Sequence, residues 1–145
     1  NQDGYEDLVA VGNDYGTETG GGRIDALNGL ALLFDPSTKS FRSLSVGESG
    51  LYVPGNGRSL VCLRGAEGQV LVAAENQGET RAYELAAAGG RWYQPGAGAA
   101  RLLLTHMDGH QSVKECYYGS GFLSQGSRNV WLAETVVEVE EVAFK

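Results

Sequence analysis

Short apolar runs separated by glycine-rich turns recur along the whole chain of 145 residues. Helical periodicity is nearly absent from these runs, and several of them alternate apolar with polar residues, which is typical of β-strands. The sequence therefore predicts strands at 8–11, 30–34, 41–44, 59–63, 70–74, 80–84, 101–106, 112–117, 130–133 and 136–144.

The connections between the runs carry the residues of tight turns. The chain has 22 glycines but only 3 prolines, and the glycine share is about twice the usual value of roughly 7%. The segment 35–38 (DPST) favours a hairpin loop, and Asp108-Gly109 is a strong hairpin signal. Only 83–89 is compatible with a short helical turn. We therefore predict an all-β fold of antiparallel sheets, sandwich-like in the isolated chain.

One stretch divides the predicted strands into two groups. Residues 86–100 are mostly small, glycine-rich and poor in charge, which indicates a linker. We expect one module at 1–85 and a second at 101–145. Within the linker, Trp92 and Tyr93 are either packing anchors, which is the more frequent role, or a binding platform.

The charge balance argues against two classes of partner. The chain has 11 Lys and Arg against 18 Asp and Glu, for a net charge of −7. Binding to nucleic acid or to an anionic membrane surface needs clustered basic residues, which this sequence lacks. It also has no run of about 20 apolar residues that would cross a bilayer. We expect neither a nucleic-acid partner nor membrane insertion.

The two cysteines, Cys62 and Cys116, each lie in a predicted strand. They are either two buried thiols that pack as small apolar side chains or a disulfide formed in an oxidising compartment. Sequence alone does not give their connectivity.

The stretch 12–35 is the most distinctive candidate site. One apolar strand leads into a glycine-rich polar loop, and a second leaves it at 30–34. The loop carries the polar side chains of Asn13, Tyr15, Glu18, Arg23 and Asp25.

Three roles are open for this loop. Arg23 can pair with Asp25 or Glu18 and so tie the loop to its strands. The loop can instead bind a polar ligand such as a sugar. Glu18 and Asp25 can also act as acid and base, provided that the pKa of one of them is raised.

A second motif, H-x-D-x-H, is formed by His106, Asp108 and His110. Alternate residues of a strand share one face, so three such side chains can converge on a metal ion. The predicted turn at Asp108-Gly109 would instead splay them apart.

Residues 134–141 largely alternate acid and valine, which is typical of a strand with one buried and one solvated face. We expect an outer strand whose glutamates limit edge pairing. An acidic binding strip is the alternative.

The first eleven residues, NQDGYEDLVAV, resemble the calcium loop of FG-GAP (VCBS-type) β-propeller repeats, whose pattern is D-x-N-x-D-G-x-x-D followed by an apolar strand. Alternate oxygen ligands converge on one hard cation in such loops, and the glycine permits the sharp turn. The resemblance implies calcium bound by the side chains of Asn1, Asp3 and Asp7 and by the Tyr5 carbonyl. The pattern's first aspartate would lie two residues before Asn1.

The order of residues from Gly12 to Arg58 resembles the C-terminal propeller segment of large FG-GAP proteins that end in an ASPIC/UnbV module. The resemblance implies that 1–85 is the end of a propeller, with one four-stranded blade and a piece of another. Upstream blades of the parent chain would then complete the wheel.

The segment 119–125 (GSGFLSQ) resembles the G-S-x-Y/F-L-S-Q signature of the ASPIC/UnbV module, which places that module at 101–145. Ser120 and Ser124 lack the G-x-S-x-G nucleophile elbow, so we expect Ser124 and Gln125 to bond to backbone at a bulge. Proteins with these modules are typically secreted or attached to the cell surface. The resemblance therefore implies a non-catalytic extracellular recognition or adhesion module that binds a protein or glycan. An enzyme acting on a glycan through the loop carboxylates is the alternative.

Overall fold

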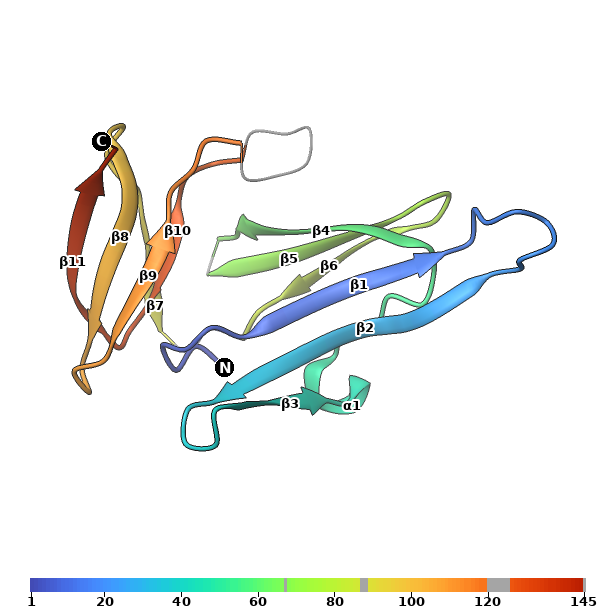
Figure 1. The fold of residues 1–145 in the computed structure, drawn as a ribbon, viewed down its shortest axis with the longest axis horizontal. Coiled ribbons are helices and arrows are strands. Elements are labelled where there is room, and N and C mark those ends of the chain that lie inside the picture. Colours follow the sequence, from blue (N-terminus) through green and yellow to red (C-terminus); the bar gives the residue numbers. More distant parts are fainter. Residues whose placement is uncertain (67, 87–88, 120–125, 145) are drawn as a thin grey trace. The chain divides into compact units, whose positions relative to one another are not determined.

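The computed structural model describes residues 1–66, 68–86, 89–119 and 126–144 (Figure 1). The chain is all-β, with 54% of its residues in strands and 3% in a helix, and every strand pair is antiparallel. The predicted fold class is confirmed, and each of the ten predicted strands is present.

The chain divides into two compact units. The first unit contains Asn1 and Glu6–Ala86, and the second contains Gln2–Tyr5 and the chain from Ala87 onward. The segment predicted as a linker, 86–100, instead contains β7 (Gly90–Tyr93) and the start of β8 (Ala99–His106). The glycines of this segment are typical of a linker, but Trp92 and Tyr93 provide the side-chain packing that β7 makes within the second unit.

The first unit holds two three-stranded sheets (Figure 1). One has the order β1-β2-β3 and the other β4-β5-β6. The described residues therefore do not form the four-stranded blade that the resemblance implies. The strands are β1 (Leu8–Asp14), β2 (Ile24–Asp35), β3 (Ser40–Leu44), β4 (Gly57–Arg64), β5 (Gln69–Glu75) and β6 (Thr80–Glu84).

The segment 83–89, which is compatible with a short helical turn, begins in β6, where residues 83 and 84 pair with β5 as the predicted strand 80–84 requires. Residues 87 and 88 of this segment lie outside the described residues. The described helix is instead α1 (Val46–Ser49), which begins with a capping box between Ser45 and Glu48. The Ser45 backbone N–H and hydroxyl, followed by Arg42, lower the pKa of Glu48 to about 2.

The core of the first unit includes part of a loop. Leu51 and Val53, from the loop between α1 and β4, are buried against Leu71 and Ala73 of β5. We call this segment, residues 51–56, the core loop. Because Leu51, Val53 and Asn56 of this loop are buried, the backbone polar groups beside them need partners within the protein.

The second unit contains a two-stranded and a three-stranded sheet. β7 pairs with β10 (Val130–Ala133), and β8 lies between β11 (Val136–Ala143) and β9 (Gln111–Glu115). The valine-rich strand β11 is at the edge of its sheet, as predicted, and its glutamates are exposed. Leu102, Leu104, Cys116, Leu132 and Val136 form the core.

The two cysteines are free thiols in the described structure, Cys62 in the first unit and Cys116 in the second. Cys116 is buried in the core of the second unit, as the buried-thiol alternative expected. Cys62 differs from that expectation because it is exposed, on the edge strand β4.

The two aromatic residues of β7 have packing roles. Trp92 lies opposite Trp131 of β10, with ring centroids 5.3 Å apart in an edge-to-face arrangement. Tyr93 packs against the core of the second unit and donates its hydroxyl to Glu141. These contacts support the role of Trp92 and Tyr93 as packing anchors and not as a binding platform.

Candidate functional site

The predicted polar loop is mostly a β-hairpin. β1 continues to Asp14 and β2 begins at Ile24, so the connecting loop is only residues 15–23. Two register shifts, on either side of Gly12, allow β1 and β2 to remain paired along this length. Residues 24–29 of β2 resemble a loop in the sequence, because the pairing that makes them a strand is with β1 and not with adjacent residues.

Asn13 belongs to the scaffold. It is 5% exposed, and its side-chain oxygen accepts hydrogen bonds from the backbone N–H groups of Ala26 (2.8 Å) and Leu27 (3.0 Å). Its amide nitrogen donates to the carbonyl oxygens of Gly55 (2.8 Å) and Pro54 (3.4 Å). The side chain is thereby occupied in joining β2 to the core loop.

Tyr15, Arg23 and Asp25 lie together at the hairpin tip, and we call them the rim. The Arg23 guanidinium carbon lies 4.8 Å from the centroid of the Tyr15 ring, a cation–π geometry. The Tyr15 hydroxyl donates its one proton to the Pro54 carbonyl oxygen at 2.9 Å. Interaction with the nearby Asp25 carboxylate, followed by burial, raises the pKa of Tyr15.

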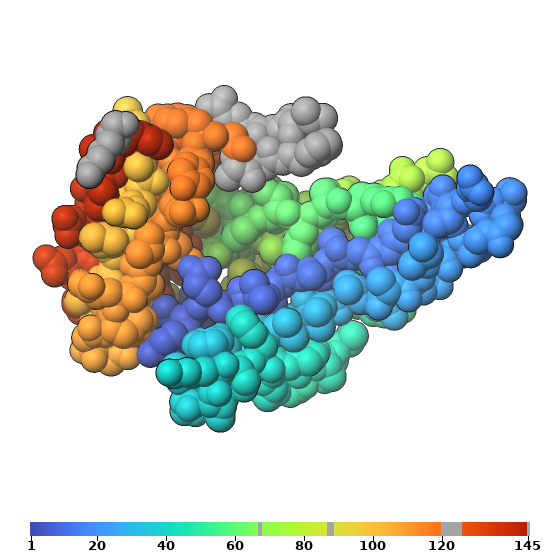
Figure 2. All heavy atoms as spheres, in the orientation of Figure 1, coloured from blue at the N-terminus to red at the C-terminus, as the bar shows by residue number. Residues whose placement is uncertain are grey.

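The charged groups of the hairpin tip face solvent. Glu18, Arg23 and Asp25 are all exposed, and Figure 2 shows the tip, in blue, at one end of the first unit. The expected ion pair of Arg23 with Asp25 or Glu18 is absent from the ion pairs of the described residues. Arg23 rests on an aromatic ring instead.

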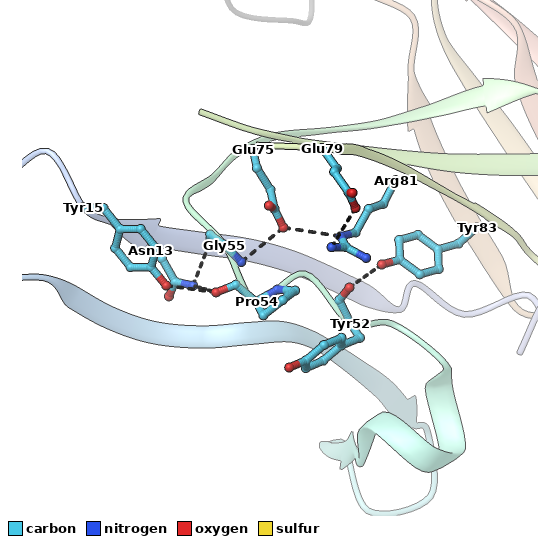
Figure 3. Close-up of polar contacts among 9 residues, drawn as sticks. All are labelled: Asn13, Tyr15, Tyr52, Pro54, Gly55, Glu75, Glu79, Arg81 and Tyr83. Atoms are coloured by element: carbon cyan, nitrogen blue, oxygen red, sulfur yellow. Dashed lines mark hydrogen bonds and ion pairs between the residues drawn. The ribbon is translucent and has the colours of Figure 1, made fainter. Parts of the chain in front are cut away.

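The core loop is held from both sheets of the first unit (Figure 3). Asn13 and Tyr15 reach it from β1 and its hairpin. On the other side, the Glu75 carboxylate of β5 accepts the Gly55 N–H at 3.1 Å, and the Tyr83 hydroxyl of β6 donates to the Tyr52 carbonyl oxygen. The rim therefore rests on a loop that both sheets fix.

Glu75 is a buried acid that the sequence did not single out. Its side chain is 8% exposed, and one oxygen lies 3.5 Å from Arg81 Nε. The same guanidinium pairs through Nη2 with the exposed Glu79 at 3.1 Å. A glutamate at a strand end is ordinarily solvated, so only the fold reveals this burial.

The four predicted calcium ligands are divided between the units. Asn1 and Asp7 belong to the first, and Asp3 and Tyr5 to the second. Asp7 Oδ1 accepts the backbone N–H of Phe34 on β2 at 2.9 Å. Asp3 Oδ1 accepts the Tyr5 N–H at 2.9 Å.

The two histidines of the H-x-D-x-H motif form a stack of rings. The hairpin does not splay the histidines, because the His106 and His110 rings lie 3.9 Å apart and nearly parallel. The Tyr5 ring also stacks on the His110 ring, with the ring centroids 4.3 Å apart. Among the residues that the structure describes, no group of three or more His, Cys, Asp or Glu side chains is arranged to hold a metal ion.

His106 itself is buried and bonded. Its Nδ1 lies 3.0 Å from Thr135 Oγ1, and its Nε2 lies 2.8 Å from Ser112 Oγ. Burial, followed by the neighbouring His110, lowers the pKa of His106. His110 Nδ1 contacts Asp108 at 2.6 Å, while its Nε2 is buried without a hydrogen-bond partner in the described structure.

The serine motif lies outside the described residues. Ser120, Ser124 and Gln125 fall in 120–125, so the predicted bulge contacts and the absence of a serine nucleophile stay predictions.

No protein-family model, curated protein or solved structure matches this chain. Within the described ranges, no helix has the length and apolar character needed to cross a membrane.

Proposed function

We propose that this chain is a non-catalytic recognition or adhesion module that binds a protein or glycan through the rim. The observation that carries the proposal is the arrangement of Arg23 over Tyr15. An exposed guanidinium is held on an aromatic ring without an ion pair to Asp25 or Glu18. Its N–H donors and the Asp25 carboxylate can then meet a polar ligand at little cost in side-chain entropy.

The wider context of the proposal comes from the sequence resemblance alone. That context is an extracellular or cell-surface location, an FG-GAP parent chain with upstream blades, an ASPIC/UnbV-like C-terminal part and a calcium ion near residues 1–7. Catalysis on a glycan through Glu18 and Asp25 is the weaker alternative, because no hydrogen bond or ion pair of the described residues brings these two carboxylates together.

Binding to a glycan array tests the proposal directly. Arg23→Ala should weaken binding by about tenfold or more, which corresponds to about 1.4 kcal/mol, and should leave thermal stability unchanged because Arg23 is exposed. Arg64→Ala, which removes another exposed arginine of the first unit, is the matched control.

Each outcome of that experiment has a defined meaning. Binding that Arg23→Ala leaves intact would refute recognition by the rim. Turnover of a bound glycan that is lost in both Glu18→Gln and Asp25→Asn would favour the enzyme instead.

A further inference from the structure

A single peptide group connects the buried Glu75 with the exposed rim. The peptide between Pro54 and Gly55 donates its N–H to Glu75 Oε1 at 3.1 Å. Its carbonyl oxygen accepts the Tyr15 hydroxyl at 2.9 Å. Because a peptide group is planar, a rotation that breaks one of these bonds also disturbs the other.

The surroundings of the Glu75 carboxylate are shaped to fit it. A Cβ added at Gly78 would lie 2.7 Å from its Oε2, and a Cβ added at Gly55 would lie closer still. Arg81 supplies the opposite charge. Two glycines and one arginine thus surround a carboxylate that is almost removed from solvent.

We propose that Glu75 is a positioning residue for the rim. By holding the N–H of the Pro54–Gly55 peptide, it directs the carbonyl oxygen toward Tyr15 (Figure 3). It thereby fixes the ring on which Arg23 lies. This inference rests on the proposed function only where it treats the rim as a binding site. The positioning of Tyr15 and Arg23 by Glu75 does not depend on any ligand.

Two signals in the protein report on this role without a ligand. The side-chain protons of Arg23 should be shifted upfield by the Tyr15 ring current, since the guanidinium lies over that ring. Tyr15 also senses Glu75 electrostatically, because the charge of Glu75 is among the causes that raise the pKa of Tyr15. A residue that served stability alone would leave the Arg23 shifts in place in a folded variant, whereas the pKa of Tyr15 reports the charge of Glu75.

The experiment compares Glu75→Ala with Glu79→Ala by NMR on the full chain labelled at arginine and tyrosine. Both variants remove one carboxylate from Arg81, but only Glu75 touches Gly55. In Glu75→Ala we expect the Arg23 δ-proton shifts to move toward random-coil values and the pKa of Tyr15 to fall. Glu79→Ala should leave the Arg23 shifts as in the wild type.

A conservative variant separates position from charge. Glu75→Gln keeps an oxygen that can accept the Gly55 N–H, so it should restore the Arg23 shifts while the pKa of Tyr15 stays below that of the wild type. If Glu75→Ala does not fold, Glu75→Asp replaces it, because the shorter side chain keeps the charge but withdraws the oxygen from Gly55. Unchanged Arg23 shifts in whichever of these two variants is folded would overturn the proposal.

Glycan binding by the same variants distinguishes the positioning role of Glu75 from the proposed recognition function of the rim. Any glycan that the wild type binds through Arg23 should bind about tenfold more weakly to Glu75→Ala than to Glu79→Ala. If no arrayed glycan binds the wild type, glycan recognition fails, and positioning is still decided by the Arg23 shifts. Binding through Arg23 that Glu75→Ala leaves unchanged would count against positioning and leave recognition standing.

Discussion

Each unit of the protein buries a polar side chain beside its apolar core, but the two are used differently. Asn13 of the first unit bonds only to backbone groups, from β2 and from the core loop. His106 of the second unit bonds to the hydroxyls of Thr135 and Ser112 and stacks on His110.

The difference shows which polar network leads to a binding surface. The groups around Asn13 continue through the Pro54–Gly55 peptide to Tyr15 and the exposed Arg23. The groups around His106 close on the β8–β9 hairpin and on Tyr5 of the N-terminal segment. The first network ends on an exposed guanidinium without an ion pair to Asp25 or Glu18, which can serve recognition. The second ends on Asp108, whose carboxylate is already bonded to His110 within the same hairpin.

Removing the amide of Asn13 should have the largest effect. Asn13→Ala leaves buried backbone groups of β2 and the core loop without partners, and each such group costs about 1–3 kcal/mol. We expect the free energy of unfolding of the first unit to fall by about 2–4 kcal/mol, measured by amide hydrogen exchange resolved by residue. Amides of the second unit should exchange as before.

Asn28→Ala is the control for that measurement, because it removes an exposed asparagine of the same hairpin. An equal loss of protection in the two units after Asn13→Ala would show that their networks are not separate, which would break the comparison.

Gly4→Ala should have an intermediate effect, confined to the second unit. Gly4 has a φ of +101°, and an added Cβ would lie 2.7 Å from His106 Nδ1 and 2.8 Å from Thr135 Oγ1. Backbone strain of this kind costs about 1–3 kcal/mol, which chemical denaturation should detect. Gly98→Ala, at a site with open space and no positive φ, should be nearly neutral. Equal stability of the two variants would contradict the close packing of Gly4 on His106.

The smallest effect concerns pH and an edge strand. Hydrogen bonds from the Gly96 N–H and then from the Tyr93 hydroxyl lower the pKa of Glu141 on β11. The folded state thus binds this proton less readily than the unfolded state does. The contribution to stability is therefore complete above the ordinary glutamate pKa of about 4.3 and is lost as the pH falls through the lowered value.

The measurement is the difference in unfolding free energy between the wild type and Glu141→Gln, followed from neutral to acid pH. We expect this difference to shrink as the pH falls below about 4.3. Glu140→Gln removes the same charge from a neighbouring exposed position and serves as the control. A difference for Glu141→Gln that stays constant with pH would count against the role of these hydrogen bonds.

The sequence located most strands but missed those that depend on distant partners. β7 was mistaken for linker because glycines begin it, and its pairing comes from β10, in particular the contact of Trp92 with Trp131. The start of β2 was mistaken for loop because its partner residues lie across a hairpin with bulges. The S-x-x-E capping box of α1 was present in the sequence and could have been recognised.

The candidate site was found in part. The glycine-rich stretch 12–35 stands out in the sequence because it gathers several kinds of polar residue: Asn13, Tyr15, Glu18, Arg23 and Asp25. The pattern does not separate the buried amide from the exposed rim, since burial depends on where the core loop passes. Glu75 is not singled out by its neighbours in sequence, because its contact with the core loop is made to Gly55, 20 residues away.

By itself, the sequence determined that this chain forms antiparallel sheets joined by glycine-rich turns, because alternation and turn chemistry act over a few neighbouring residues. Only the tertiary structure decided which polar side chains are buried and which remain exposed. The physical reason is that a buried polar group needs partners, and for Asn13 and Glu75 those partners come from segments far away in the chain.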